Sequence, residues 1–167
     1  MHHRGLYIGR FQPFHLGHLD AVKQALAECQ FLIIGIGSAE QNHLPDNPFT
    51  ASERWEMITT ALEEARIPQE QYTIIPVRNI NNYAIWVEHV SKIVPSFNAI
   101  YTGSPIIKKL FSEHPKYDLN ELTFKHDISA SQVRKAIKDD QDWESLVPKN
   151  VANYLKRING PERLKIV

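Results

Sequence analysis

A decapeptide near the start of the chain, residues 9–18, constrains the fold more than any other stretch. It follows a short apolar run at 6–8 and precedes a segment whose apolar residues recur at helical spacing, a pattern that predicts a strand, a turn and a helix. The first N–H groups of a helix lack partners and lie at the positive end of its dipole, so anions bind there readily. His15 and His18 are expected on one face of this first turn. The decapeptide therefore predicts either a phosphate site or a simple turn.

Strand-like and helix-like segments alternate along the whole chain. Strands are expected at 6–8, 31–37, 72–77, 98–101 and, more weakly, 122–124, and helices at 16–28, 50–65, 84–94, 106–112, 133–138 and 148–158. Capping boxes at 50–53 and 129–132 mark two helix starts, and a loosely attached tail is expected after Gly160. This alternation predicts an α/β fold, a Rossmann-like open parallel sheet with helices on both faces.

Length and composition set the broad class. The 167 residues predict one domain, 1–167, with the C-terminal helices from about residue 141 packed on it. A formal net charge of zero provides no basic field for nucleic acid or for a membrane surface. The single cysteine, Cys29, excludes a disulfide framework, and no apolar run approaches the ~20 residues that span a bilayer. We therefore expect a cytoplasmic protein.

Small or polar residues follow four of the predicted strands. These pairs are Gly9-Arg10, Gly37-Ser38, Arg78-Asn79 and Gly103-Ser104. In open parallel sheets, ligands bind at the carboxyl ends of the strands, near the point where the strand order reverses. The four pairs are therefore expected at one rim, which is the predicted site.

The histidine pair allows three interpretations. Neither the dinucleotide fingerprint G-x-G-x-x-G nor the P-loop pattern is present at the first turn. The two histidines of an isolated H-x-x-H are more often surface or core residues without a role in a site. Imidazole pairs can also bind zinc. No cysteine or third ligand accompanies this pair, so no metal-binding residues are predicted. The flanking glycine, arginine and prolines favour a phosphate site.

A second motif, Ser129-x-Ser131-x-x-Arg134, lies about 115 residues downstream. Alone, it indicates no more than a solvated helix start. Hydroxyl groups and free N–H groups at a helix start can hold phosphate oxygens, and Arg134 can add charge-assisted hydrogen bonds. Together, the two motifs predict that both helix starts grip one polyphosphate.

At this point the chain resembles a known family. The two motifs are similar to those of the H-x-G-H nucleotidyltransferase superfamily. The wider match is to the archaeal-type nicotinamide mononucleotide (NMN) adenylyltransferases, and it covers about residues 4–163. The stretches that carry it are 5–15, 35–39, Asn47-Pro48-Phe49-Thr50-Ala51-x-Glu53-Arg54, Trp86 and 159–163.

The resemblance implies transfer of AMP from ATP to the 5′-phosphate of NMN, giving NAD and pyrophosphate. It implies catalytic roles for His15, His18, Arg10 and Arg134, and Mg²⁺ bound with ATP. Nucleotide-binding roles are implied for Gly9, Phe11, Gly17, Gly37, Ser38, Asn79, Tyr83, Trp86, Gly103, Ser104, Ser129 and Ser131. Of these, Gly37 and Ser38 would lie along the mononucleotide and Gly103 and Ser104 near the adenosine. The resemblance also implies a homo-oligomer, often a hexamer.

Some alternatives stay open. Trp86 would stack on the nicotinamide ring by the resemblance, whereas its helical position alone is equally compatible with a core side chain. The family often has Asp-Ile-x-x-Asn before this tryptophan, but the chain reads Asn79-Ile80-Asn81-Asn82-Tyr83. Asp46 also stands in a proline-flanked loop where some relatives have arginine. Another acceptor (nicotinate mononucleotide, FMN or phosphopantetheine) and a catalytically idle nucleotide-binding regulator remain alternatives.

Overall fold

A parallel sheet of five strands forms the centre of the molecule. The structure is a computed structural model that describes residues 2–167. The strands are β1 (His2–Gly9), β2 (Cys29–Ile36), β3 (Tyr72–Pro76), β4 (Ala99–Thr102) and β5 (Asp118–Glu121). Their order is β3-β2-β1-β4-β5. The chain therefore winds first to one side of β1 and then to the other, which puts the topological switch point between β1 and β4.

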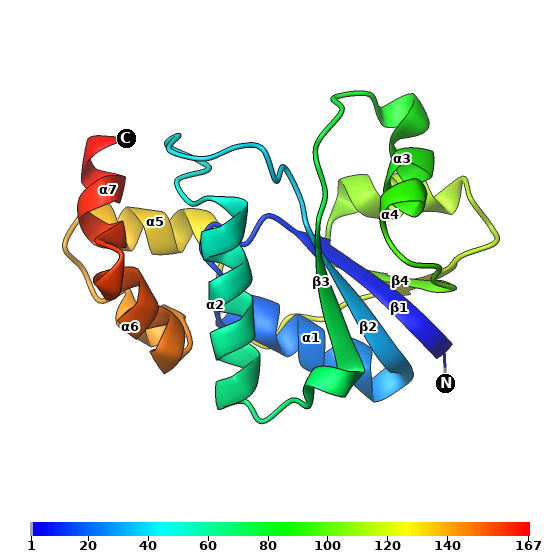
Figure 1. Ribbon diagram of the computed structural model, residues 1–167, viewed down its shortest axis with the longest axis horizontal. Coiled ribbons are helices and arrows are strands. Elements are labelled where there is room, and N and C mark those ends of the chain that lie inside the picture. Colours follow the sequence, from blue (N-terminus) through cyan, green and yellow to red (C-terminus); the bar gives the residue numbers. More distant parts are fainter. Residues whose placement is uncertain (1) are drawn as a thin grey trace.

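Helices cover both faces of the sheet (Figure 1). The helices are α1 (Leu16–Glu28), α2 (Ala51–Glu64), α3 (Trp86–Ile93), α4 (Pro105–Ser112), α5 (Ala130–Lys138), α6 (Lys149–Arg157) and α7 (Gly160–Ile166). Three short 3₁₀ turns lie at Gln69–Gln71, Tyr83–Ile85 and Glu144–Leu146. Across residues 2–167, no helix combines the length and apolar character that a membrane crossing requires.

Alternating side chains of the strands divide the core into two layers. Leu32, Ile34 and Ile36 of β2 pack with α1, α2 and the C-terminal helices α5 to α7. Ile33 of the same strand packs with α3 and α4 on the opposite face. Successive strand residues point to opposite faces, and a strand buried on both faces is apolar throughout. The predicted α/β sheet with helices on both faces is thus confirmed.

The helix starts lie close to the expected positions. At the start of α2, Thr50 Oγ1 accepts a hydrogen bond from Glu53 N (3.1 Å) and Glu53 Oε2 accepts one from Thr50 N (2.9 Å). These reciprocal bonds satisfy two of the N–H groups that a helix start leaves free. The capping box predicted from residues 50–53 is therefore confirmed.

The fifth strand was predicted at the wrong residues. It covers Asp118–Glu121 rather than 122–124, and it pairs in parallel with β4 alone. As an edge strand its side chains are only partly buried. A polar edge strand lacks the apolar signal on which the prediction depended.

The tail after Gly160 was also predicted wrongly. Residues Gly160–Ile166 form α7, in which Leu164 is fully buried in the same core layer as α1 and α2. Arg163 makes a two-pronged ion pair with Glu53, with distances of 2.7 and 2.8 Å. The tail is held by partners more than 100 residues away, which local periodicity does not reveal.

Candidate active site

The two histidines of the decapeptide cap the helix that they begin. Gly17 N donates to His15 Nδ1, and His15 N donates to His18 Nδ1, both at 3.1 Å. The two rings stack with their centroids 3.6 Å apart. A Cβ on Gly17 would lie 2.9 Å from the His15 ring, so a side chain at this position would displace the histidine. The N-terminal turn of α1 is thus a compact, internally bonded unit.

This capping determines which ring nitrogens carry protons. A backbone N–H only donates, so both Nδ1 atoms must be unprotonated and each neutral ring carries its proton on Nε2. Burial lowers the pKa of His15 to about 4. Burial, with a further contribution from His15, holds the pKa of His18 well below its usual value. At neutral pH the turn therefore presents two uncharged imidazoles, each with an Nε2–H donor.

The low pKa of His15 predicts a loss of stability in acid. Its unfolded-state pKa is 6.5 and its folded-state pKa about 4, so the unfolded chain binds the extra proton first as the pH falls. This one group should lower the free energy of unfolding by about 3 kcal/mol between pH 6.5 and pH 4. Chemical unfolding at several pH values measures the slope. His15→Asn keeps a cap acceptor without a titrating ring, and an equal acid loss in that variant would contradict the prediction.

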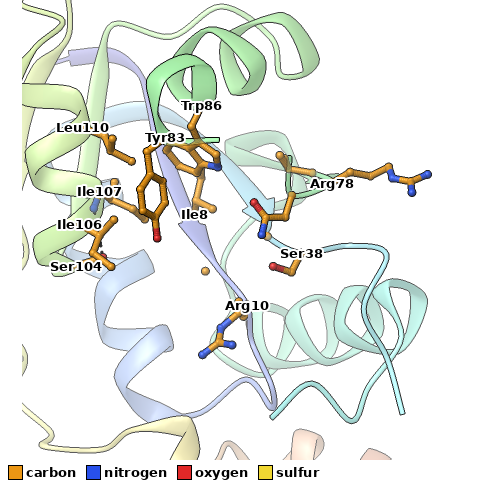
Figure 2. A pocket seen from close by; sticks show the side chains of 14 residues that line it. Ile8, Arg10, Ser38, Arg78, Tyr83, Trp86, Ser104, Ile106, Ile107 and Leu110 are labelled. Carbon is orange, nitrogen blue, oxygen red and sulfur yellow. Dashed lines mark hydrogen bonds between the residues drawn. The ribbon is translucent and has the colours of Figure 1, made fainter. Parts of the chain in front are cut away.

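A cavity of about 310 Å³ lies at the carboxyl ends of the strands. Figure 2 shows Trp86 and Tyr83 on one side of it, Ile106, Ile107 and Leu110 of α4 beside them, and Arg10 and Ser38 nearby. The predicted residues that line it are Gly9, Arg10, Gly37, Ser38, Asn79, Tyr83, Trp86 and Ser104. We call this the first cavity. Residues from all four predicted rim pairs therefore meet in a single hollow with an apolar wall.

A second cavity, of about 280 Å³, opens beside the histidines. His15, His18, Gly103 and Ser104 line it, together with Phe124 and His126. Ile8, Gly9 and Ser104 belong to the lining of both cavities, so the two adjoin across the end of β1. A Cβ on Gly103 would lie 2.1 Å from the Phe124 ring, which therefore lies directly against the backbone of this residue.

The two predicted arginines contact one loop. Arg10 Nη1 donates to Asn47 Oδ1 at 3.5 Å, and Arg134 Nη2 lies 3.4 Å from Asp46 Oδ1. Arg134 is buried and also donates to Gln12 O and to Ser131 Oγ, at 2.9 and 3.2 Å. Its burial lowers its pKa, while Asp46 opposes that shift. Both guanidinium groups thus contact side chains of the loop after β2, that of Arg10 with Asn47 and that of Arg134 with Asp46.

The start of α5 is capped as predicted. Ser129 Oγ accepts from Gln132 N at 3.1 Å, and Gln132 Oε1 accepts from Ser129 N at 2.8 Å. The helix begins at Ala130, three residues before the predicted start, so Arg134 lies in its second turn.

Some of the predicted residues do not reach the cavities. In the described part of the chain, Phe11, Gly17, Ser129, Ser131 and Arg134 are outside the lining of both. Phe11 is fully buried, with its ring edge-on to His18 at 4.8 Å, so its side chain supports the histidine rather than contacting a ligand.

Sequence reasoning missed part of each lining. In the first cavity these include Ile106, Ile107 and Leu110 of α4. In the second cavity they include Phe124, His126 and Asp127. The sequence offered one signal for each set. The residues of α4 follow Ser104-Pro105, and residues 124–127 precede the Ser129 motif, so both sets are neighbours of predicted site residues. His126 is held by a hydrogen bond between its Nδ1 and the carboxylate of Asp20 in α1, a contact that no sequence pattern indicates.

Comparison with known proteins gives consistent matches. The cytidylyltransferase-like family model matches residues 6–136. A nicotinamide-nucleotide adenylyltransferase of Thermococcus sibiricus is 44% identical over 165 residues, covering 98% of this chain and 89% of the relative. One of Pyrococcus horikoshii is also 44% identical, over 163 residues, covering 97% and 87%.

A solved structure has the same fold. It is a bifunctional NMN adenylyltransferase/ADP ribose pyrophosphatase of Francisella tularensis, crystallised with AMP and a manganese ion. The TM-score is 0.82 at 24% sequence identity, over 99% of this chain. The chain spans 51% of that protein, about half its length.

Proposed function

The chain belongs to the cytidylyltransferase-like family and, within it, to the nicotinamide-nucleotide adenylyltransferases. On this basis we propose that its two cavities bind ATP and NMN side by side, so that AMP is transferred from ATP to NMN. The products are NAD and pyrophosphate. The observation that carries the proposal is the adjacency of the cavities. One is lined by Trp86 and apolar side chains, the other by His15 and His18, and they share Gly9 and Ser104. A nucleotide in each would bring its phosphate to the shared boundary.

The reaction is a direct displacement at phosphorus. A phosphate oxygen of NMN attacks the α-phosphorus of ATP, and the bond to the bridging oxygen of the β-phosphate breaks, so pyrophosphate leaves with the electron pair. The attacking phosphate is already anionic and needs no general base. The protein contributes alignment and stabilisation of developing charge. We assign the Nε2–H groups of His15 and His18 to the ATP phosphates and Arg10 and Arg134 to the leaving pyrophosphate.

A divalent cation is proposed to accompany ATP. Among residues 2–167 the structure contains no group of three His, Cys, Asp or Glu side chains placed to bind a metal. Mg²⁺ keeps several waters and binds readily to substrate phosphates. We therefore propose Mg²⁺ held mainly by phosphate oxygens and water, where it would neutralise charge on the triphosphate.

Three further features are also proposals. Residues 1–167 act as one nucleotidyltransferase domain, since the C-terminal helices share a core layer with α1 and α2. A homo-oligomer, often a hexamer by the family resemblance, is tested by light scattering. The cytoplasmic location rests on the sequence alone and is tested by cell fractionation.

A pyrophosphate-release assay tests the function. ATP and Mg²⁺ are supplied with NMN, nicotinate mononucleotide, FMN or phosphopantetheine. We expect the highest kcat/KM with NMN. The Trp86 ring suits the planar cationic pyridinium of NMN and of nicotinate mononucleotide alike, and the similarity to relatives named nicotinamide-nucleotide adenylyltransferases favours the nicotinamide form. Faster turnover of another acceptor would reassign the substrate. ATP binding without pyrophosphate release from any acceptor would instead identify a nucleotide-binding regulator.

The contact between Asp46 and Arg134 predicts a gain from one substitution. Asp46 is 78% exposed, and an exposed pair contributes about 1 kcal/mol at most. A triphosphate that uses Arg134 must displace this carboxylate, so Asp46→Asn should lower the KM for ATP roughly two- to fivefold, with kcat unchanged. Asp140→Asn removes another exposed carboxylate, paired with Lys165, and serves as control. A higher KM in Asp46→Asn would mean that Asp46 assists ATP binding.

A further inference from the structure

Arg54 is a buried cation that the reaction described above does not use. It lies on α2, within the Asn47–Arg54 motif, and its side chain is fully buried. Within residues 2–167 it forms no ion pair with a carboxylate. Burial lowers its pKa to about 10, so the guanidinium is still charged at neutral pH. A buried charge of this kind is stable only if polar groups surround it.

Backbone carbonyl groups provide these partners. The Arg54 guanidinium donates to the carbonyl oxygens of Thr50, Arg10, Gly37, Ser38, Ala39 and Gln41, at 2.8 to 3.4 Å. Thr50 is the cap residue of its own helix, whereas the other five belong to the turns after β1 and β2. Ser38 has a φ of 46°, in the left-handed region, which lets the loop curl around the cation. Arg54 therefore ties together two neighbouring turns of the rim.

The orientation of one peptide group follows from this bonding. The carbonyl of Gly37 points to Arg54 Nη1 at 2.8 Å. In a planar trans peptide the following N–H points in the opposite direction, so the Ser38 N–H is directed away from Arg54. Among residues 2–167 this N–H has no acceptor, and Ser38 lines the first cavity. The neighbouring N–H groups of Ala39 and Gln41, in contrast, bond to Val77 O and Ser38 O.

We propose that Arg54 is a positioning residue that holds the Gly37–Ser38 peptide so that the Ser38 N–H binds the phosphate of the acceptor mononucleotide. The inference rests on the proposed function, because it assigns the first cavity to that substrate. A free backbone N–H beside a fixed positive charge is a favourable anion donor. Arginine is required because its planar fork carries five N–H groups, all of which are used here, whereas lysine has three donors on one nitrogen.

Arg54→Lys, which keeps the charge and loses the fork, tests the proposal. We expect the KM for NMN to rise about tenfold and the KM for ATP to rise no more than about twofold. The Ser38 donor is lost, whereas the Arg10 side chain, whose carbonyl Arg54 also holds, keeps its own contact with Asn47. Arg163→Lys is the matched control, because Arg163 also donates to a backbone carbonyl of this motif, that of Pro48. The control should lower Tm and leave both KM values unchanged. Unchanged KM values in folded Arg54→Lys would overturn the proposal.

A second measurement uses the wild-type protein and does not depend on the folding of a variant. On titration with NMN, the Ser38 amide resonance should shift more than those of Ala39 and Gln41, whose N–H groups already have acceptors. An unmoved Ser38 resonance at saturation would overturn the proposal. Pyrophosphate release by the wild type tests the function separately, so a protein that turns over NMN with Ser38 unmoved would keep the function and lose the role of Arg54.

Discussion

Replacing His18 with asparagine is expected to lower kcat by about a hundredfold, the usual effect of removing one donor to a developing charge. The ring has two tasks in the structure. Its Nδ1 accepts the His15 N–H, and its Nε2 is left to donate. An asparagine amide reaches the position of Nδ1 but not that of Nε2. His18→Asn should therefore keep the cap, with Tm close to that of the wild type, and lose the phosphate contact.

The complementary variant separates the two tasks. In His18→Gln the longer amide places an N–H near the position of Nε2 and leaves the cap acceptor displaced. We expect this variant to retain more kcat than His18→Asn and to unfold at a lower temperature, since losing a helix cap costs about 1 kcal/mol. Steady-state kinetics and thermal unfolding of both variants provide the comparison. If His18→Asn kept the wild-type kcat, His18 would be a helix cap and nothing more.

Trp86→Ala is expected to weaken NMN binding about thirtyfold, or ~2 kcal/mol, the range of a lost stacking partner for a cationic ring. The Trp86 ring lies edge-on to Phe111 at 6.2 Å and also lines the first cavity. It is therefore anchored on one side and available to a ligand on the other. Calorimetric titration with NMN and with ATP measures the two affinities, and ATP binding should change less than twofold.

Two variants control for loss of structure. Trp86→Phe keeps an aromatic face and should recover most of the affinity. Trp55→Ala removes an exposed tryptophan of α2 that lies outside both cavities and should leave NMN binding unchanged. Wild-type affinity for NMN in Trp86→Ala would mean that this tryptophan belongs to the core alone.

Features set by residues close in sequence were predictable. The reciprocal bonds of Thr50 with Glu53, and of Ser129 with Gln132, involve residues three apart, so four letters were enough to predict two capping boxes. The rim residues were predictable for a related reason, because parallel strands bring their carboxyl ends to one edge. Strand β5 was mispredicted because pairing with β4, and not its own apolar pattern, makes it a strand.

The sequence by itself determined the alternation of strands and helices, the capped helix starts and the set of residues at the rim, because each depends on short-range spacing. Only the tertiary structure decided how those residues are used. It placed Asp46 against Arg134 across 88 residues, and it bonded the buried Arg54 to carbonyl groups of the turns after β1 and β2. Such contacts join residues that are far apart in the sequence and meet only when the chain is folded, so spacing along the chain does not predict them.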